Sequence, residues 1–80
     1  MHKVVVTNIN TNEEHVFYDI CNPNGTVKES ALDQARKKYN ELRHKNKVTI
    51  THVYPDYKHG LIKSDLIECN VWSRRMRYEN

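Results

Sequence analysis

The stretch that decides the fold is residues 30–54, SALDQARKKYNELRHKNKVTITHVY, in which a helical pattern gives way to a strand pattern. In its first part apolar residues recur every three or four positions, the spacing of one face of a helix. These residues are Ala31, Leu32, Ala35, Tyr39 and Leu42. Residues 48–54 then alternate β-branched and polar side chains, as a half-buried strand does. The stretch therefore predicts a helix followed by a strand.

The helix has two candidate starting points. Residues 22–25 form a strong break, because proline fixes φ and glycine permits positive φ. Directly after it, Thr26 and Glu29 have the spacing of a capping box, in which each side chain bonds a free backbone N–H. Ser30, followed by Asp33, offers a second and slightly later start. Both starts remain open at this point.

Further strands are expected on either side of the stretch. Residues 3–9 and 15–20 predict a hairpin, since both are rich in apolar and β-branched residues. Residues 55–60 indicate a loop, and residues 61–62 either extend it or form a short strand. Residues 66–78 predict a last strand of uncertain length. The expected fold is α+β, in the order β-β-α-β-β, with an antiparallel or mixed sheet and one helix packed on one face.

The length and composition of the chain bound what it can be. Its 80 residues fit a single domain, 1–80, with one modest core. No stretch approaches the ~20 apolar residues of a membrane span, and no secretory signal is evident, so we expect a cytoplasmic protein without a membrane partner. In that compartment Cys21 and Cys69 are expected to be buried thiols, although two cysteines leave a disulfide open.

Positive charge is concentrated in the centre of the chain. The net charge is +3. Residues 28–47 carry seven Lys or Arg against three acids. Six of these cations lie outside the apolar stripe of the expected helix: Arg36, Lys37, Lys38, Arg43, Lys45 and Lys47. They form either a phosphate-contacting face or an ordinary solvated helix surface.

Two further segments combine features of binding surfaces. Near its end the chain interleaves cations with large side chains: Trp72, Arg74, Arg75, Met76, Arg77 and Tyr78. Arginine and aromatic side chains can stack on bases or anchor a protein interface, but they also occur in ordinary edge strands. Tyr54 and Tyr57 bracket the expected loop and suit protein contact.

No motif for catalysis, metal or cofactor binding is evident. The five histidines do not form H-x-x-x-H or H-E-x-x-H, and there is no glycine-rich phosphate loop. We therefore expect a protein that is not an enzyme and holds no metal or cofactor. A small histidine-dependent nuclease or toxin remains an alternative, because one histidine in a small α+β fold can suffice.

The chain resembles small phage-encoded host-takeover proteins, among them inhibitors of host RNA polymerase and some anti-CRISPR proteins. The resemblance rests on the N-terminal hairpin, on residues 30–39 and on residues 48–51. It implies an inhibitor in the host cell that binds a host protein or nucleoprotein complex without catalysis, for anti-defence or host takeover. Many such proteins are acidic and imitate DNA, whereas this chain is basic. No residue in these segments is a family-defining motif, so no functional residue is carried over.

Two other possibilities remain beside the inhibitor. A small basic nucleic-acid-binding module would use the helix and the C-terminal segment for direct nucleic-acid contact. A homodimer is also possible, because exposed edge strands can pair two copies of a chain.

Overall fold

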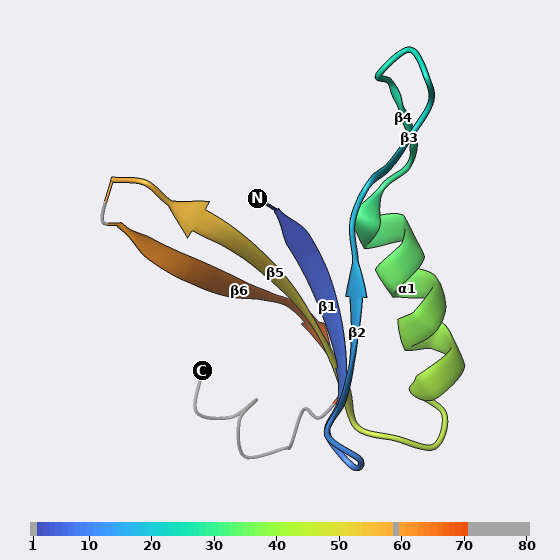
Figure 1. The fold of residues 1–80 in the computed structure, drawn as a ribbon. Coiled ribbons are helices and arrows are strands. Elements are labelled where there is room, and N and C mark those ends of the chain that lie inside the picture. The colour runs from blue at the N-terminus through green and yellow to red at the C-terminus, as the bar shows by residue number, and fades with distance from the viewer. Residues whose placement is uncertain (1, 59, 71–80) are drawn as a thin grey trace.

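The core of the molecule is a four-stranded antiparallel sheet with one helix on one face. The computed structural model describes residues 2–58 and 60–70. In the sheet the strands lie in the order β2-β1-β5-β6, and the helix stands along one face of the sheet (Figure 1). The bounds of these elements are β1 Lys3–Asn8, β2 Glu13–Phe17, α1 Ala31–Leu42, β5 Val48–Asp56 and β6 Leu61–Cys69. The α+β class and the single helix packed on one face agree with the sequence expectation.

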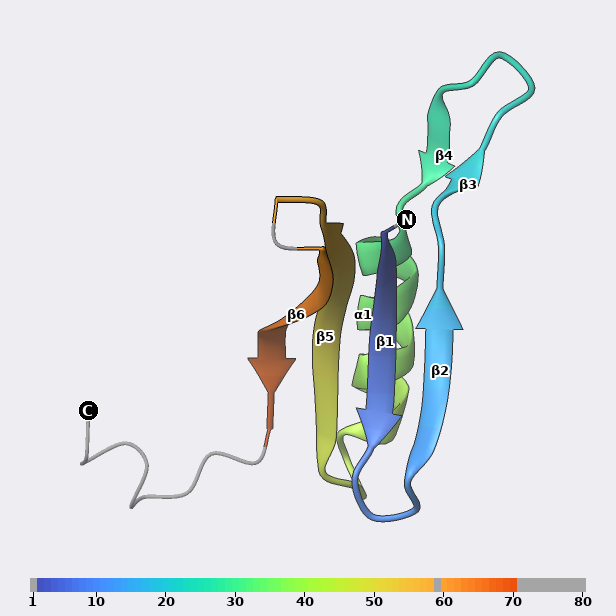
Figure 2. The same cartoon turned by 60° about the vertical axis from the view of Figure 1, so that its left-hand side comes forward.

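A second pair of strands lies outside this sheet. Strands β3 Ile20–Cys21 and β4 Val27–Glu29 pair with each other and form a separate two-stranded sheet. With the turn between them they make a hairpin that projects from the rest of the molecule (Figure 2). The described order is therefore β-β-β-β-α-β-β, and the expected order β-β-α-β-β missed this pair.

The helix begins at the later of its two candidate starts. Ser30 has extended backbone, and its side chain accepts a hydrogen bond from the Asp33 N–H at 3.1 Å. The capping-box interpretation of Thr26 and Glu29 is wrong, because both belong to the projecting hairpin. The Asn24 side chain accepts from the Thr26 N–H at 3.1 Å and holds that residue in the turn. A local side-chain bond thus competes successfully with helix initiation.

Substitutions at the two candidate caps should have different effects. We expect Ser30→Ala to lower the free energy of unfolding by about 1 kcal/mol, because it leaves a helix N–H without its acceptor. Thr26→Ala should cost less than about 0.5 kcal/mol, since it alters an exposed turn. Urea unfolding of both variants measures the difference. An equal or larger loss in Thr26→Ala would contradict the observed helix start.

The core lies between the helix and one face of the sheet. Strands β1 and β5 supply the sheet side, and Val6 lies directly opposite Ile50 in their register. The core residues are Val4, Val6, Ala31, Ala35, Tyr39, Val48 and Ile50. Leu32 and Leu42 pack against this cluster, so the predicted apolar stripe of the helix is confirmed.

Strands β5 and β6 pair with each other closer to their connecting turn than the sequence indicated. Pairing with β1 stops at Val53, but pairing with β6 continues to Asp56. Pro55 is tolerated there because β5 has only one neighbouring strand at that point. The loop expected at residues 55–60 therefore begins at residue 57, two residues later than expected. Strand β6 ends at Cys69, and the rest of the expected strand, residues 71–78, lies outside the described residues.

Candidate functional site

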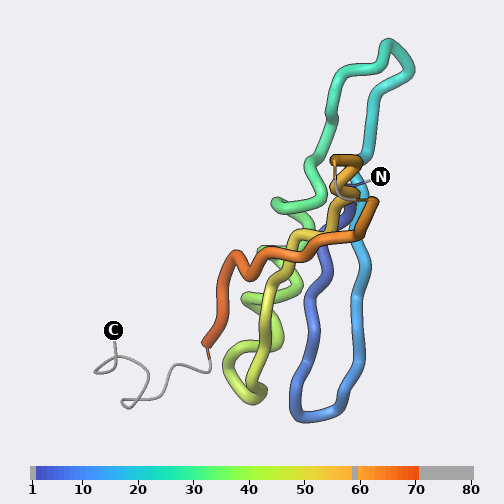
Figure 3. The backbone as a smooth tube through the Cα atoms, turned by 90° about the vertical axis from the view of Figure 1, so that its left-hand side faces the viewer, coloured from blue at the N-terminus to red at the C-terminus, as the bar shows by residue number. Residues whose placement is uncertain are grey.

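Two hairpins project from the compact base of sheet and helix. We call residues 18–29 the finger; they comprise β3, β4, their turn and the link from β2. We call residues 54–58 and 60–67 the arm; they comprise the end of β5 beyond β1, turn residues and most of β6. In Figure 3 the finger rises past the N-terminal end of β1, and no other segment lies beside its tip.

These two hairpins carry most of the exposed large hydrophobic side chains. On the finger these are Tyr18, Ile20 and Val27, and on the arm Tyr57, Leu61, Ile62, Leu66 and Ile67. Among the described residues only Ile9 and Val16 are comparable elsewhere. Apolar side chains gathered on projecting segments are typical of surfaces that bind another macromolecule.

The root of the finger is fixed to the start of the helix. The Asp19 carboxylate accepts a hydrogen bond from the Ala31 N–H at 2.7 Å. The Gln34 side-chain amide donates to the Tyr18 carbonyl at 2.6 Å and, more weakly, to the Glu29 carbonyl at 3.5 Å. Both ends of the finger, Tyr18 and Glu29, are thus tied to one side chain of the helix. A hairpin held in this way loses little conformational entropy on binding.

The tip of the finger is a tight turn with its own hydrogen bonds. The Asn22 N–H donates to the Thr26 carbonyl at 2.7 Å, and the Gly25 N–H donates to the Asn22 carbonyl at 2.9 Å. Gly25 has φ of 90°, a conformation that side chains with a Cβ rarely adopt. Cys21 is exposed beside this turn, so the expectation that both cysteines are buried is wrong for Cys21 and holds for Cys69. Neither is in a disulfide.

An aromatic cluster lies where the arm leaves the base. His2 Nδ1 is 3.2 Å from His52 Nε2, and the ring of Tyr54 packs against both imidazoles. The Tyr54 hydroxyl donates to the Asp65 carboxylate at 2.9 Å. Beside this cluster a cavity of about 240 Å³ opens toward Asp19 at the finger root. The cluster therefore connects β1, β5 and β6 at the base of the arm.

Over residues 2–58 and 60–70 no three histidine, cysteine, aspartate or glutamate side chains gather at a spacing that would hold a metal ion.

The Tyr54–Asp65 bond should be visible in an alkaline titration. The hydrogen bond to Asp65 raises the pKa of Tyr54, and partial burial adds to the effect. Because the pKa is raised, the bond stabilises the fold below pH ~10 and is lost as pH rises through the higher folded value. We expect Asp65→Asn to lower the Tyr54 pKa in a near-ultraviolet titration. Tyr39, whose pKa is raised mainly by burial, should titrate as before; an unchanged Tyr54 would contradict the bond.

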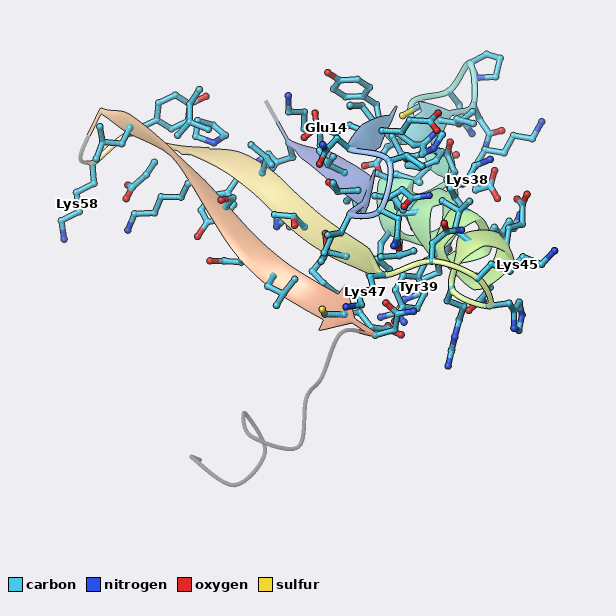
Figure 4. All side chains as sticks on the ribbon, turned by 90° about the horizontal axis from the view of Figure 1, so that it is seen from below. Glu14, Lys38, Tyr39, Lys45, Lys47 and Lys58 are labelled. Atoms are coloured by element: carbon cyan, nitrogen blue, oxygen red, sulfur yellow. The ribbon has the colours of Figure 1, made fainter. Side chains whose placement is uncertain are left out.

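Acids partly neutralise the basic helix. Arg36 pairs with Glu68 at 2.8 Å, Lys37 with Glu29, and Lys38 with Glu41 at 3.9 Å. Half of the six candidate binding cations thus have an acidic partner. Arg43 lies 5.7 Å from the centre of the Tyr39 ring. Lys45 and Lys47 are exposed after the helix, and Figure 4 shows Lys58 far from both, at the end of the arm.

The other predicted binding residues are separated by the fold. Tyr54 lies within β5 and is half-buried, whereas Tyr57 is 85% exposed at the turn of the arm. The C-terminal set of Trp72, Arg74, Arg75, Met76, Arg77 and Tyr78 lies outside the described residues.

Sequence reasoning missed the finger, although a signal for it is present. Asn24-Gly25 is a strong turn dipeptide, and β-branched Ile20 and Val27 flank it. Such a pattern indicates a hairpin rather than a break followed by a helix.

No protein-family model, curated protein or solved structure matches the chain. In the part of the chain that the structure describes, no helix is long and apolar enough to span a membrane.

Proposed function

We propose that this chain is a binding protein without catalytic activity, and that the finger is its contact with a protein partner. The resemblance to phage host-takeover proteins makes a host protein or nucleoprotein complex the partner class to test first, with inhibition as the result of binding. The observation that carries this function is the finger itself, an apolar hairpin that projects from the base while its root is fixed to the helix.

Strands β3 and β4 of the finger contribute no residue to the core. Isolated two-stranded hairpins are at best marginally stable, so a hairpin that only connected β2 to the helix would gain nothing from exposed apolar side chains. Tyr18, Ile20 and Val27 are each about half exposed. Burial of the exposed half of each side chain in an interface is favourable by about 0.7–1.5 kcal/mol, half the value for a fully exposed one. Three of them on a pre-oriented hairpin therefore suit an interface anchor.

The charge of the finger favours protein over nucleic acid. Its ionisable side chains include Asp19, Glu29 and a single cation, Lys28. A surface that grips phosphates needs several cations together. The helix cations that could supply them are partly occupied by ion pairs with acids.

Affinity purification from host lysate, with and without nuclease, tests this function. We expect one protein or complex to be recovered in stoichiometric amount, to survive nuclease treatment and to change little with salt. Recovery of nucleic acid alone, lost steeply as salt rises, would instead assign the chain to nucleic-acid binding through the helix cations. Recovery of no stoichiometric partner would contradict the proposed function.

A further inference from the structure

We propose that strand β6 pairs antiparallel with β6 of a second copy of the chain, with Ser64 on the two-fold axis. The two four-stranded sheets would then form one continuous sheet. This pairing goes beyond the proposed function and does not depend on it, because it assigns an occupant to the arm rather than to the finger.

Strand β6 is an exposed edge of the sheet. It has β5 as a neighbour on one side, and it is the last strand in the order β2-β1-β5-β6. All of its residues from Leu61 to Ile67 are exposed, although four of them are large and apolar. An apolar edge of this length is a template for another strand, and natural sequences usually protect such edges with charges.

The sequence of β6 is complementary to itself in one antiparallel register. When Ser64 lies opposite its own copy, Lys63 faces Asp65 of the second copy, and Ile62 faces Leu66 of the second copy. Leu61 then faces Ile67, the residue that the bulge in β6 leaves without a partner in β5. Every apolar residue thus meets an apolar one, and each lysine meets an aspartate.

Neighbouring registers lose this complementarity. In an antiparallel pair, two opposed residues either both hydrogen-bond across the pair or both do not. When the two strands are identical, this condition is met only if the two-fold axis passes between a residue and its own copy. Centring on Lys63 or on Asp65 opposes two like charges, which is destabilising. Centring on Leu66 places Asp65 opposite Ile67 and Lys63 opposite Cys69. Among these registers the Ser64 register alone pairs both charges and apolar residues well.

The two faces of β6 agree with this register. Ile62, Ser64 and Leu66 share the sheet face away from the helix, since their partners in β5 are Pro55, Val53 and Thr51. That face is already apolar beside Ile62, where Lys3, Val53 and Pro55 line a shallow pocket. Pairing would therefore continue an apolar strip from one copy to the other.

The charged residues retain capacity for the second copy. Lys63 lies 3.0 Å from Asp56 and is half exposed, and its ammonium has three donors. The Asp65 carboxylate uses Oδ2 for the Tyr54 hydroxyl, and a carboxylate can accept further bonds at its other oxygen. Each copy would contribute one Lys63–Asp65 pair, so the interface would contain two such pairs related by the axis.

The opposite edge of the sheet is less suited to pairing. Strand β2 begins with Glu13 and Glu14, and centring it on His15 opposes Glu14 to Val16 and Glu13 to Phe17. The finger follows β2 and lies at this edge, away from β6 (Figure 2). A dimer formed through β6 would consequently leave both fingers accessible.

Sedimentation equilibrium of purified variants, in which the charges of Lys63 and Asp65 are reversed singly and together, tests the β6–β6 pairing. We expect the wild type to dimerise with a dissociation constant of about 1–100 μM, typical of a small interface. Lys63→Asp and Asp65→Lys should each weaken the dimer at least about tenfold, because like charges would face each other. The double variant restores opposite charges and should return to within about threefold of wild type.

Circular dichroism of each variant separates loss of the dimer from loss of the fold. A wild-type chain that remains monomeric at about 500 μM, well above the upper end of the expected range, would overturn the pairing. So would a folded double variant that dimerises no better than the single variants.

Crosslinking tests the register independently. In a Cys21→Ser background, Ser64→Cys places two thiols opposite each other across the axis and should give a disulfide-linked dimer under mild oxidation. Ile62→Cys is the matched control, because it faces Leu66 of the second copy and should crosslink much less. Equal crosslinking at the two positions would exclude the Ser64 register.

Discussion

Replacement of Ile50 with alanine is expected to lower the free energy of unfolding by about 3–4 kcal/mol. Ile50 is fully buried, and it lies opposite Val6 between the sheet and the helix. A chain of this length has a total stability of only about 4–12 kcal/mol, so one such cavity removes a large part of it. Urea unfolding followed by circular dichroism measures the loss.

Ile9→Ala is the matched control for this prediction. Ile9 has the same side chain but is 43% exposed, so its truncation should cost less than about 1 kcal/mol. If both variants lost the same stability, the core would not lie where the structure places it.

Substitution of Ile20 and Val27 by serine is expected to weaken partner binding at least about tenfold. Each position loses an apolar side chain whose exposed half the partner would bury, and two losses of about 0.7–1.5 kcal/mol give this factor. Stability should change little, because neither residue belongs to the core. The affinity of the purified partner, measured by surface plasmon resonance, shows the effect.

The control is the double substitution of Ile9 and Val16 by serine. These residues are exposed to a similar extent but lie outside both hairpins. We expect the control to bind within about threefold of wild type. Equal weakening by the two double variants would remove the finger from the interface.

Periodicity predicted the parts of the fold that depend on burial. The helix stripe and the alternation of Val48 and Ile50 reflect one apolar face each, and both faces meet in the core. The start of the helix was harder to predict, because Thr26 and Ser30 are equally good caps as isolated residues. The side chain of Asn24 decides between them by holding Thr26 in a turn.

The finger could not be derived from burial, because it has no core. Its strands are two and three residues long and show no alternation between a buried and an exposed face. Their pairing depends on the turn at Asn24-Gly25 and on tertiary bonds from Gln34, which lies on the helix, 16 residues after Tyr18 and five after Glu29.

The basic candidate binding residues were predicted from their charge, but the fold brings acidic side chains next to some of them. Arg36 is on an exposed face of the helix, as its position in the sequence indicates. Its partner Glu68 lies on β6, and no sequence spacing indicates that contact. Tyr57 is as exposed as expected, whereas the longer strand β5 draws Tyr54 into the cluster with His2 and His52.

Photocrosslinking from the finger in host cells tests most directly whether it contacts a protein partner. A photoreactive amino acid at Val27 should crosslink to one protein, the same protein that affinity purification recovers. The same group at Val16 should give no such product. Val16 lies in β2, outside the finger, and is similarly exposed. Crosslinks to that protein from Val16 but not from Val27 would show that the finger is not the binding site.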